Sequence, residues 1–309
     1  MIELVDRLES VILGKRRALK YLVSSVLAGG HILVEDLPGL GKTTLAKALS
    51  AAIGTDTERV HFRRIQCTPD LLPFDITGVD VFDPGHQRFT FQPGPVFTNI
   101  LLADEINRAT PKVQSALLEV MAENQVTVGG RRYEMAPLFL VLATENPVEM
   151  EGTYPLPLAQ LDRFMIRLAL GYPDRDTELR VLAQRPSDTV LPGLRPAVSI
   201  DAVLEARAKV VDIHMAPAVR DAAVDLVRMT REDERFLHGA SPRGVLMLSR
   251  MMQAFAYLSG RDYVTEDDFM EMAVPVLAHR VLPVHGINTV EVVDELAQRR
   301  LERLYGELR

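Results

Sequence analysis

The sequence predicts an α/β fold in which a parallel-sheet core with two inserted β-hairpins is followed by a smaller all-helical domain. Three observations support this prediction. Short apolar runs alternate with helical segments in the first part of the chain, two turn motifs interrupt that alternation, and strand-like runs end near Pro173. We therefore divide the chain into a core at residues 1–172 and a helical domain at residues 173–309.

Five short apolar runs are predicted to be the core strands. Continuous apolar runs are typical of strands that are buried on both faces of a parallel sheet. Between the third and fourth runs, apolar residues recur at helical spacing from Val113 to Met121 and predict a helix at 111–123 with one buried face. The predicted strands are His31–Val34, Val60–Ile65, Ile100–Ala103, Leu138–Thr144 and Met165–Leu170.

Two hairpins are predicted between these core elements. The first covers residues 79–91 and turns at Asp83-Pro84-Gly85-His86. The second covers residues 125–135 and turns at Gly129-Gly130. Gly-Gly between alternating strands is a strong signal for a two-residue hairpin turn.

Helical patterns dominate the chain after Pro173. A Pro/Gly-rich segment at 191–196 links the first of these helices to the rest. Thr265 is predicted to cap a helix, with Asp268 in the place of the capping-box acid. Ser241 is predicted to cap another helix through its side chain, with proline at the first helical position.

The composition is ordinary for a globular protein. Of 309 residues, 47% are apolar and 25% are charged, which is enough material for more than one domain. The net charge of −7 and pI near 5.6 argue against a dedicated nucleic-acid binder. The single cysteine, Cys67, cannot form an internal disulfide and suits a reducing compartment. The start of the chain lacks a signal-peptide pattern and no run approaches the ~18–20 apolar residues of a membrane span, so we expect a cytoplasmic protein.

The segment after the first strand predicts a phosphate-binding loop. Gly39 and Gly41 would let backbone N–H groups turn toward an anion, and the following helix adds partial positive charge at its N-terminus. Lys42 would reach the β- and γ-phosphates of a nucleotide, and the Thr43 hydroxyl would ligate magnesium. Asp36 stands where the usual motif has its first glycine. The candidate binding residues are Asp36, Leu37, Pro38, Gly39, Leu40, Gly41, Lys42, Thr43 and Thr44.

Polar residues follow two further predicted strands. Asp104 would hold magnesium, and Glu105 would act as the base that polarises the attacking water. The alternative is that these two acids only cap the next segment. Asn146 ends the next strand, where it would orient that water or contact the γ-phosphate. The alternative for Asn146 is a simple Asn-Pro turn.

Two arginines are candidates for contacts with a γ-phosphate. Arg163 precedes the last predicted core strand, a place too far from its own nucleotide for an obvious ligand, so it could serve a neighbouring subunit as an arginine finger. The alternative is a surface ion pair with Asp162. Arg243 lies in the first turn of a predicted helix, where it would contact the γ-phosphate and tie the position of the helical domain to the nucleotide. The alternative for Arg243 is a solvated side chain.

Together these segments resemble the AAA+ ATPases and, within them, the MoxR family. The resemblance covers nearly the whole chain, and an acidic residue at position 36 is normal for that family. Residues 11–14, which include Leu13 and Gly14, are similar to the adenine-side loop of such enzymes. The most specific matches are Asp36–Thr43, Phe91–Phe97, Ala103–Ala109, Thr144–Pro147, Glu151–Pro157 and Gln160–Phe164.

The resemblance implies roles, cofactors and partners. By resemblance Asn146 is sensor 1, Arg163 is the arginine finger, Arg243 is sensor 2, and ATP and Mg²⁺ are the cofactors. The hairpins resemble the helix-2 and pre-sensor-1 insertions. Family members are chaperone-like ATPases, usually hexameric rings, that mature or activate protein complexes or insert metal cofactors. Their partner is often a protein with a von Willebrand factor A domain.

Other functional classes remain in competition with a chaperone-like ATPase. A nucleic-acid-dependent motor is one, because Arg131 and Arg132 lie near a hairpin tip and could touch phosphate. Against it stand the acidic chain and the lack of aromatic residues at that tip for base stacking. A transcription activator would carry a GAFTGA loop, which is absent. A fourth class is a non-enzymatic nucleotide switch, and the complete set of Lys42, Asp104, Glu105 and Arg163 argues against it.

Overall fold

The core of the protein is a five-stranded parallel sheet with the order β2-β5-β8-β1-β9. The computed structural model describes residues 1–55, 57–148 and 152–307, so Glu151 of the motif at 151–157 lies outside the described residues. The strands are β1 (His31–Glu35), β2 (Phe62–Gln66), β5 (Ile100–Asp104), β8 (Leu140–Glu145) and β9 (Phe164–Leu168). All five predicted strands are confirmed, with ends shifted by at most two residues.

Helices cover both faces of this sheet because alternate strand residues point to opposite sides. Ile32 and Leu142 belong to a buried cluster shared with the N-terminal helices and the helical domain, whereas Leu33 and Val141 face a second cluster around α5. The helices of this part are α1 (Ile2–Glu9), α2 (Arg16–Leu27), α3 (Lys42–Ala52), α4 (Pro73–Thr77), α5 (Pro111–Glu123) and α6 (Leu158–Leu161).

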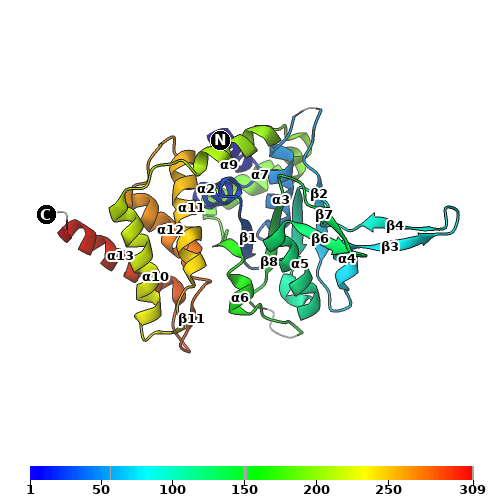
Figure 1. Ribbon diagram of the computed structural model, residues 1–309. Coiled ribbons are helices and arrows are strands. Elements are labelled where there is room, and N and C mark those ends of the chain that lie inside the picture. The colour runs from blue at the N-terminus through cyan, green and yellow to red at the C-terminus, as the bar shows by residue number, and fades with distance from the viewer. Residues whose placement is uncertain (56, 149–151, 308–309) are drawn as a thin grey trace.

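Both predicted hairpins are present, and they touch each other. One is formed by β3 (Gly78–Asp83) and β4 (Arg88–Pro93), and it projects away from the body of the molecule (Figure 1). The other is formed by β6 (Gln125–Val128) and β7 (Arg131–Glu134). Phe91 of the first stacks on Tyr133 of the second, with ring centroids 4.0 Å apart. The two hairpins are therefore mechanically linked through aromatic packing.

The rest of the chain is mainly helical, as predicted. A short antiparallel pair, β10 (Phe236–His238) and β11 (Leu282–Pro283), is the exception, and it is too short to show an alternating pattern in the sequence. The predicted capping box of Thr265 and Asp268 is confirmed. The helices are α7 (Arg175–Gln184), α8 (Pro186–Thr189), α9 (Ile200–Val210), α10 (Pro217–Glu232), α11 (Pro242–Leu258), α12 (Glu266–Leu277) and α13 (Thr289–Glu307).

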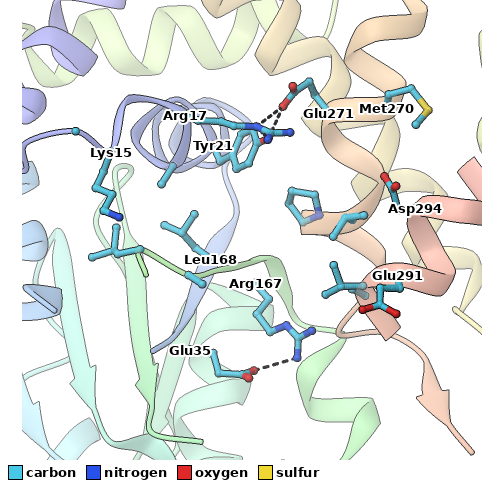
Figure 2. A pocket seen from close by; sticks show the side chains of 18 residues that line it. Lys15, Arg17, Tyr21, Glu35, Arg167, Leu168, Met270, Glu271, Glu291 and Asp294 are labelled. Atoms are coloured by element: carbon cyan, nitrogen blue, oxygen red, sulfur yellow. Dashed lines mark hydrogen bonds and ion pairs between the residues drawn. The ribbon is translucent and has the colours of Figure 1, made fainter. Parts of the chain in front are cut away.

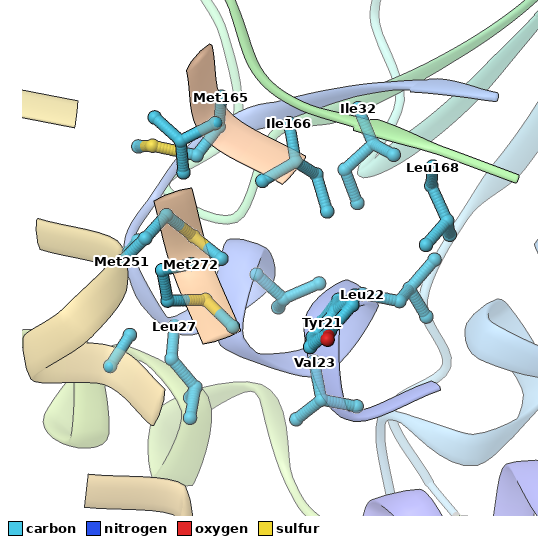
Figure 3. Close-up of a cluster of buried hydrophobic side chains, with 14 of the residues drawn as sticks. Tyr21, Leu22, Val23, Leu27, Ile32, Met165, Ile166, Leu168, Met251 and Met272 are labelled. Carbon is cyan, nitrogen blue, oxygen red and sulfur yellow. The ribbon is translucent and has the colours of Figure 1, made fainter. Parts of the chain in front are cut away.

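A continuous hydrophobic cluster joins the helical domain to the core. Figure 3 shows the α2 side chains Leu22 and Leu27 in one group with the sheet residues Met165 and Ile166 and the helical-domain residues Met251 and Met272. Because the cluster is continuous, the boundary at residues 172 and 173 stays a prediction. Within the described ranges, no helix combines the length and the hydropathy that crossing a bilayer requires.

Candidate active site

The loop between β1 and α3 has the geometry of an anion-binding turn. Gly39 and Gly41 adopt φ values of 83° and 87°, which glycine reaches without steric cost. Gly41 occupies the N-cap position of α3 and has no side chain to cap it. The first N–H groups of α3 therefore remain free of a side-chain acceptor, and the helix dipole adds to their attraction for an anion.

Lys42 begins α3 and is held by the backbone around it. Its Nζ donates to the carbonyl oxygen of Asp36 at 2.5 Å and to that of Glu145 at 3.3 Å. Burial lowers the pKa of Lys42, although the carboxylates of Asp104, Asp36 and Glu105 act in the opposite direction. The ammonium is thus fixed over the loop by neutral carbonyls, which a phosphate can replace or supplement.

Asp36 holds the loop in place rather than facing it. Its Oδ2 accepts hydrogen bonds from the backbone N–H groups of Leu170 at 2.6 Å and Gly171 at 2.9 Å, and the residue is buried. Its Oδ1 accepts from the N–H of Leu37 at 3.1 Å. These contacts explain an acidic residue at the first position of the loop, because the carboxylate fastens the end of β1 to the end of β9.

Asp104 ends β5 with both carboxylate oxygens engaged. Oδ1 accepts a hydrogen bond from the Thr144 hydroxyl at 2.5 Å, and Oδ2 accepts two from Arg64, at 2.6 and 3.0 Å. Asp104 and Thr43 both line the phosphate-loop cavity, so their oxygens fit the preference of Mg²⁺ for hard ligands. The Arg64 guanidinium occupies one of those oxygens in this structure.

Glu105 is held in an unusual backbone conformation. Its φ of 56° and ψ of 53° lie in the left-handed region, which non-glycine residues rarely adopt. The Glu105 N–H donates to the Thr144 hydroxyl at 2.8 Å, and its Oε2 accepts from Gln66 and pairs with Arg108, each at 3.0 Å. The expected base is therefore engaged by two side chains in this state of the molecule.

One cavity brings most of the candidate residues together. It has a volume of about 330 Å³, and Asn146 faces it beside the loop and the two acids. Asn146 also forms the turn weighed as its alternative, because its Oδ1 accepts from the N–H of Val148 at 3.2 Å. The lining residues are Pro38, Gly39, Gly41, Lys42, Thr43, Thr44, Asp104, Glu105 and Asn146.

A second, largely apolar cavity of about 260 Å³ shares Gly39, Gly41 and Thr44 with the first. Leu13 and Leu40 line it, as does Val181 of α7. Its size and apolar walls suit a flat aromatic base next to the phosphate site. Gly14 does not line it; a Cβ at this position would lie 2.8 Å from the Thr177 hydroxyl oxygen.

A third and larger cavity, of about 740 Å³, opens between the core and the helical domain (Figure 2). Gly14 lies in its wall rather than in that of the apolar cavity. Figure 2 shows Glu35 paired with Arg167 at 3.0 Å on the core side, and Arg17 paired with Glu271 at 3.0 Å across the gap. The helical domain therefore leaves open space against the carboxyl end of β9.

Arg163 and Arg243 line neither the phosphate-loop cavity nor the apolar one. The ion pair weighed for Arg163 is not formed, because Asp162 pairs with Arg280 at 3.0 Å instead. Within the part of the chain that the structure describes, the Arg163 side chain has no hydrogen bond or ion pair. The Arg243 charge acts on Arg280 and on His31, which lies at the amino end of β1, and Arg243 is absent from the described residues that line the phosphate-loop cavity.

Ser241 differs from its prediction. It occupies the N-cap position of α11, but its side chain does not cap the helix. Its hydroxyl instead donates to Asp162 Oδ2 at 3.0 Å. The Ser241 hydroxyl is directed toward the Asp162 carboxylate because a hydrogen bond to a charged acceptor is stronger than one to a neutral group.

Four functional-site residues were missed from the sequence: Arg64, Gln66, Thr144 and Arg108. Arg64 and Gln66 are two apart in β2, so they point to the same side. The signal that could have identified them is the presence of polar side chains in a strand expected to be buried on both faces. Thr144 ends a predicted strand, and its hydroxyl bonds the Asp104 carboxylate and the Glu105 N–H of another strand. No short segment of the sequence could have indicated these contacts.

Comparisons with known proteins agree with this geometry. Residues 31–166 match the family model described as "ATPase family associated with various cellular activities (AAA)", and residues 228–298 match an AAA lid domain. The chain is 42% identical to YeaC of Bacillus subtilis over 94% of this chain and 91% of that protein. It is 36% identical to Chaperone MoxR1 of Mycobacterium tuberculosis over 96% and 79% of the two chains. A crystal structure from Cytophaga hutchinsonii superimposes with a TM-score of 0.86, at 38% identity, covering 96% and 93% of the two chains.

Proposed function

Because this chain belongs to the MoxR family of AAA+ ATPases, and so hydrolyses ATP, we propose that it uses hydrolysis to remodel, mature or activate a protein complex. The observation that supports this proposal best is the cavity in which Lys42, Thr43, Asp104, Glu105 and Asn146 meet. Phosphoryl transfer to water requires a lysine that binds phosphate, two oxygen ligands for a metal, a carboxylate base and a neutral polar group.

In the proposed bound state, the N–H groups of the loop and the Lys42 ammonium hold the β- and γ-phosphates. Thr43 and Asp104 would hold Mg²⁺, which supplies positive charge against the phosphate oxygens. Arg64 would compete with the metal for Asp104 Oδ2, because both of its hydrogen bonds to the carboxylate use that oxygen. The adenine base of ATP would occupy the apolar cavity beside Leu13 and Val181.

Glu105 would accept the proton of the attacking water, and Asn146 would orient that water. In this structure Gln66 and Arg108 hold the Glu105 carboxylate. The same carboxylate must reach the attacking water, so we expect that Glu105 leaves at least one of these partners before hydrolysis. We expect slow turnover by the isolated chain for this reason.

We propose that Arg163 and Arg243 both act on the nucleotide of a neighbouring subunit. Neither lies at its own phosphate loop, and the Arg163 side chain has no partner among the described residues. A homo-oligomeric ring, hexameric by resemblance to the family, would bring each arginine pair to the next site. Arg243 would then report on the neighbour's γ-phosphate rather than on its own.

The client we propose is a protein that contains a von Willebrand factor A domain, as the family resemblance implies. A relative named as a chaperone supports a protein client in general. Insertion of a metal cofactor into that client is the more specific possibility. The buried, free Cys67 fits a reducing compartment such as the cytoplasm.

Hydrolysis is tested with two single variants. Glu105→Gln should retain ATP binding and lose turnover, because an amide cannot accept the proton. Lys42→Ala should lose ATP binding itself. Nucleotide affinity is measured with a fluorescent ATP analogue and turnover by phosphate release. Wild-type turnover by Glu105→Gln would contradict the assignment of the base.

The shared site is tested by mixing Arg163→Ala with Glu105→Gln. Mixed rings contain some sites with an intact Glu105 and an intact neighbouring Arg163, so turnover should recover. Each variant alone is the control, and subunit exchange is verified by native mass spectrometry. Mixed rings that stay inactive would contradict an arginine supplied by the neighbour. Stimulation of turnover by DNA instead of by the client protein would favour a nucleic-acid motor.

A further inference from the structure

Arg280 makes a set of contacts that centre on Arg163. The Arg280 side chain is fully buried, and its Nε donates to Asp162 Oδ1 at 3.0 Å. Its Nη atoms donate to the backbone carbonyls of Asp162 at 3.5 Å and Met165 at 3.2 Å, and to that of Phe164. The carbonyls on both sides of Arg163 are therefore bound to one guanidinium of the helical domain.

We propose that Arg280 is a positioning residue for Arg163, fixing the backbone that carries it and coupling that backbone to the helical domain. The proposal rests on the role in trans that is proposed above for Arg163. It goes beyond that role because it names what holds the arginine finger and what would move it.

A second contact ties the same point to the helical domain. Ser241, at the start of α11, donates to Asp162 Oδ2, while Arg280, just after α12, holds Asp162 Oδ1. Asp162 is thus the place where two helical-domain elements meet the core. Arg163 follows Asp162 directly and Arg243 lies two residues beyond Ser241, so the Ser241–Asp162 hydrogen bond links the segments that carry the two arginines.

Arg163 depends on these contacts because its own side chain supplies none. Among the described residues, no hydrogen bond or ion pair fixes its guanidinium, so the contacts of Arg280 with residues 162–165 fix the point of the backbone from which the side chain extends. Arginine is suited to hold this backbone, because its planar fork carries five donors at fixed angles. Lysine at position 280 would keep the charge but would lose most of these hydrogen bonds.

The charges in this cluster support a permanent contact. Burial lowers the pKa of Arg280 to about 10, against the opposing effect of Asp162, so the guanidinium stays charged at neutral pH. Burial and the Arg280 charge lower the pKa of His279, which stays neutral beside it. Arg280 therefore keeps its positive charge beside Asp162 at neutral pH.

The helical domain also meets the two ends of β9 differently. It is fastened to the amino end of β9 through Arg280, whereas the cavity of about 740 Å³ separates it from the carboxyl end. Any rotation of the helical domain about the fastened end would turn the segment that carries Arg163. The same motion would change the geometry at the neighbouring subunit's phosphate site.

The test is a double-mutant cycle of Arg280→Lys and Arg163→Ala in the full-length chain. Arg280→Lys alone should lower kcat by about ten- to hundredfold, since a small misplacement of a catalytic group costs about that much. Its affinity for a fluorescent ATP analogue should change by less than about twofold. In the Arg163→Ala background, Arg280→Lys should have no further effect on kcat, because its effect passes through Arg163.

Arg300→Lys is the matched control. Arg300 is also a buried arginine of the helical domain, and it pairs with Asp225 at 2.8 Å, within that domain. We expect its kcat within about twofold of the wild type, even where its melting temperature falls. A general effect of disturbing the helical domain would lower kcat in both lysine variants.

The outcomes separate this proposal from the one on which it rests. Wild-type kcat in Arg163→Ala would reject the arginine finger itself. A large loss in Arg163→Ala, with either wild-type kcat in Arg280→Lys or multiplying losses in the double variant, would reject only the positioning role. If Arg280→Lys does not fold, Asp162→Asn replaces it in the same cycle and is judged by the same criterion.

Discussion

Glu145 gives the fold a measurable dependence on pH. It ends β8 beside Glu35, its register partner at the end of β1. Burial, and then the Glu35 carboxylate, raise the pKa of Glu145 to about 7 from an ordinary value of 4.5, while Arg167 acts in the opposite direction. Because the folded pKa is the higher one, the stabilising effect of the proton is full below pH 4.5. It is lost as pH rises from 4.5 through 7.

Glu145→Gln removes this titration while keeping nearly the same volume. The pKa difference between the folded and unfolded states is about 2.5 units, which corresponds to about 3 kcal/mol of unfolding free energy at pH 8. At pH 5 the advantage of the glutamine variant should be only about 1 kcal/mol, because most of the loss has not yet occurred. For a chain of 309 residues, 3 kcal/mol raises the melting temperature by about 5 °C.

The assay is thermal unfolding of the two proteins between pH 5 and pH 8, followed by circular dichroism. Taking the difference between variant and wild type cancels the effects of His31 and His279, whose lowered pKa values are common to both. Glu119→Gln is the matched control, since Glu119 is an exposed glutamate on α5. An advantage for Glu145→Gln that stays constant or shrinks as pH rises would refute the reasoning.

Two further predictions follow from contacts of the core. Arg64→Ala should lower the magnesium concentration needed for half-maximal turnover, by up to about fivefold, because a half-exposed ion pair with Asp104 is worth about 1 kcal/mol at most. An unchanged magnesium titration would mean that Arg64 does not compete with the metal. Gly30→Ala should destabilise the protein by about 1–3 kcal/mol, because a Cβ there would lie 2.2 Å from the Met165 Cβ. Urea denaturation measures this, and wild-type stability would show that Met165 can move aside.

The sequence by itself determined the elements whose signals are local. An apolar run followed by a glycine turn and Gly-Lys-Thr could be interpreted without any knowledge of the rest of the chain. The run that begins at Leu138 and the run that ends at Leu170 were each predicted two residues too long at that end. Both leucines are buried, although β8 begins at Leu140 and β9 ends at Leu168. The gathering of Lys42, Asp104 and Asn146 in one cavity follows from a general rule, since the carboxyl ends of parallel strands share one edge.

Only the tertiary structure decided which partner each polar side chain takes. The Ser241 hydroxyl sits where a helix cap is expected, yet it bonds Asp162, which is 79 positions away in the chain. Asp36 fastens two strand ends, and Arg280 holds the backbone around Arg163 from the other domain. Such contacts depend on how the helical domain is oriented on the core. That orientation results from the summed packing of many apolar side chains, so no short segment of the sequence carries a signal for it.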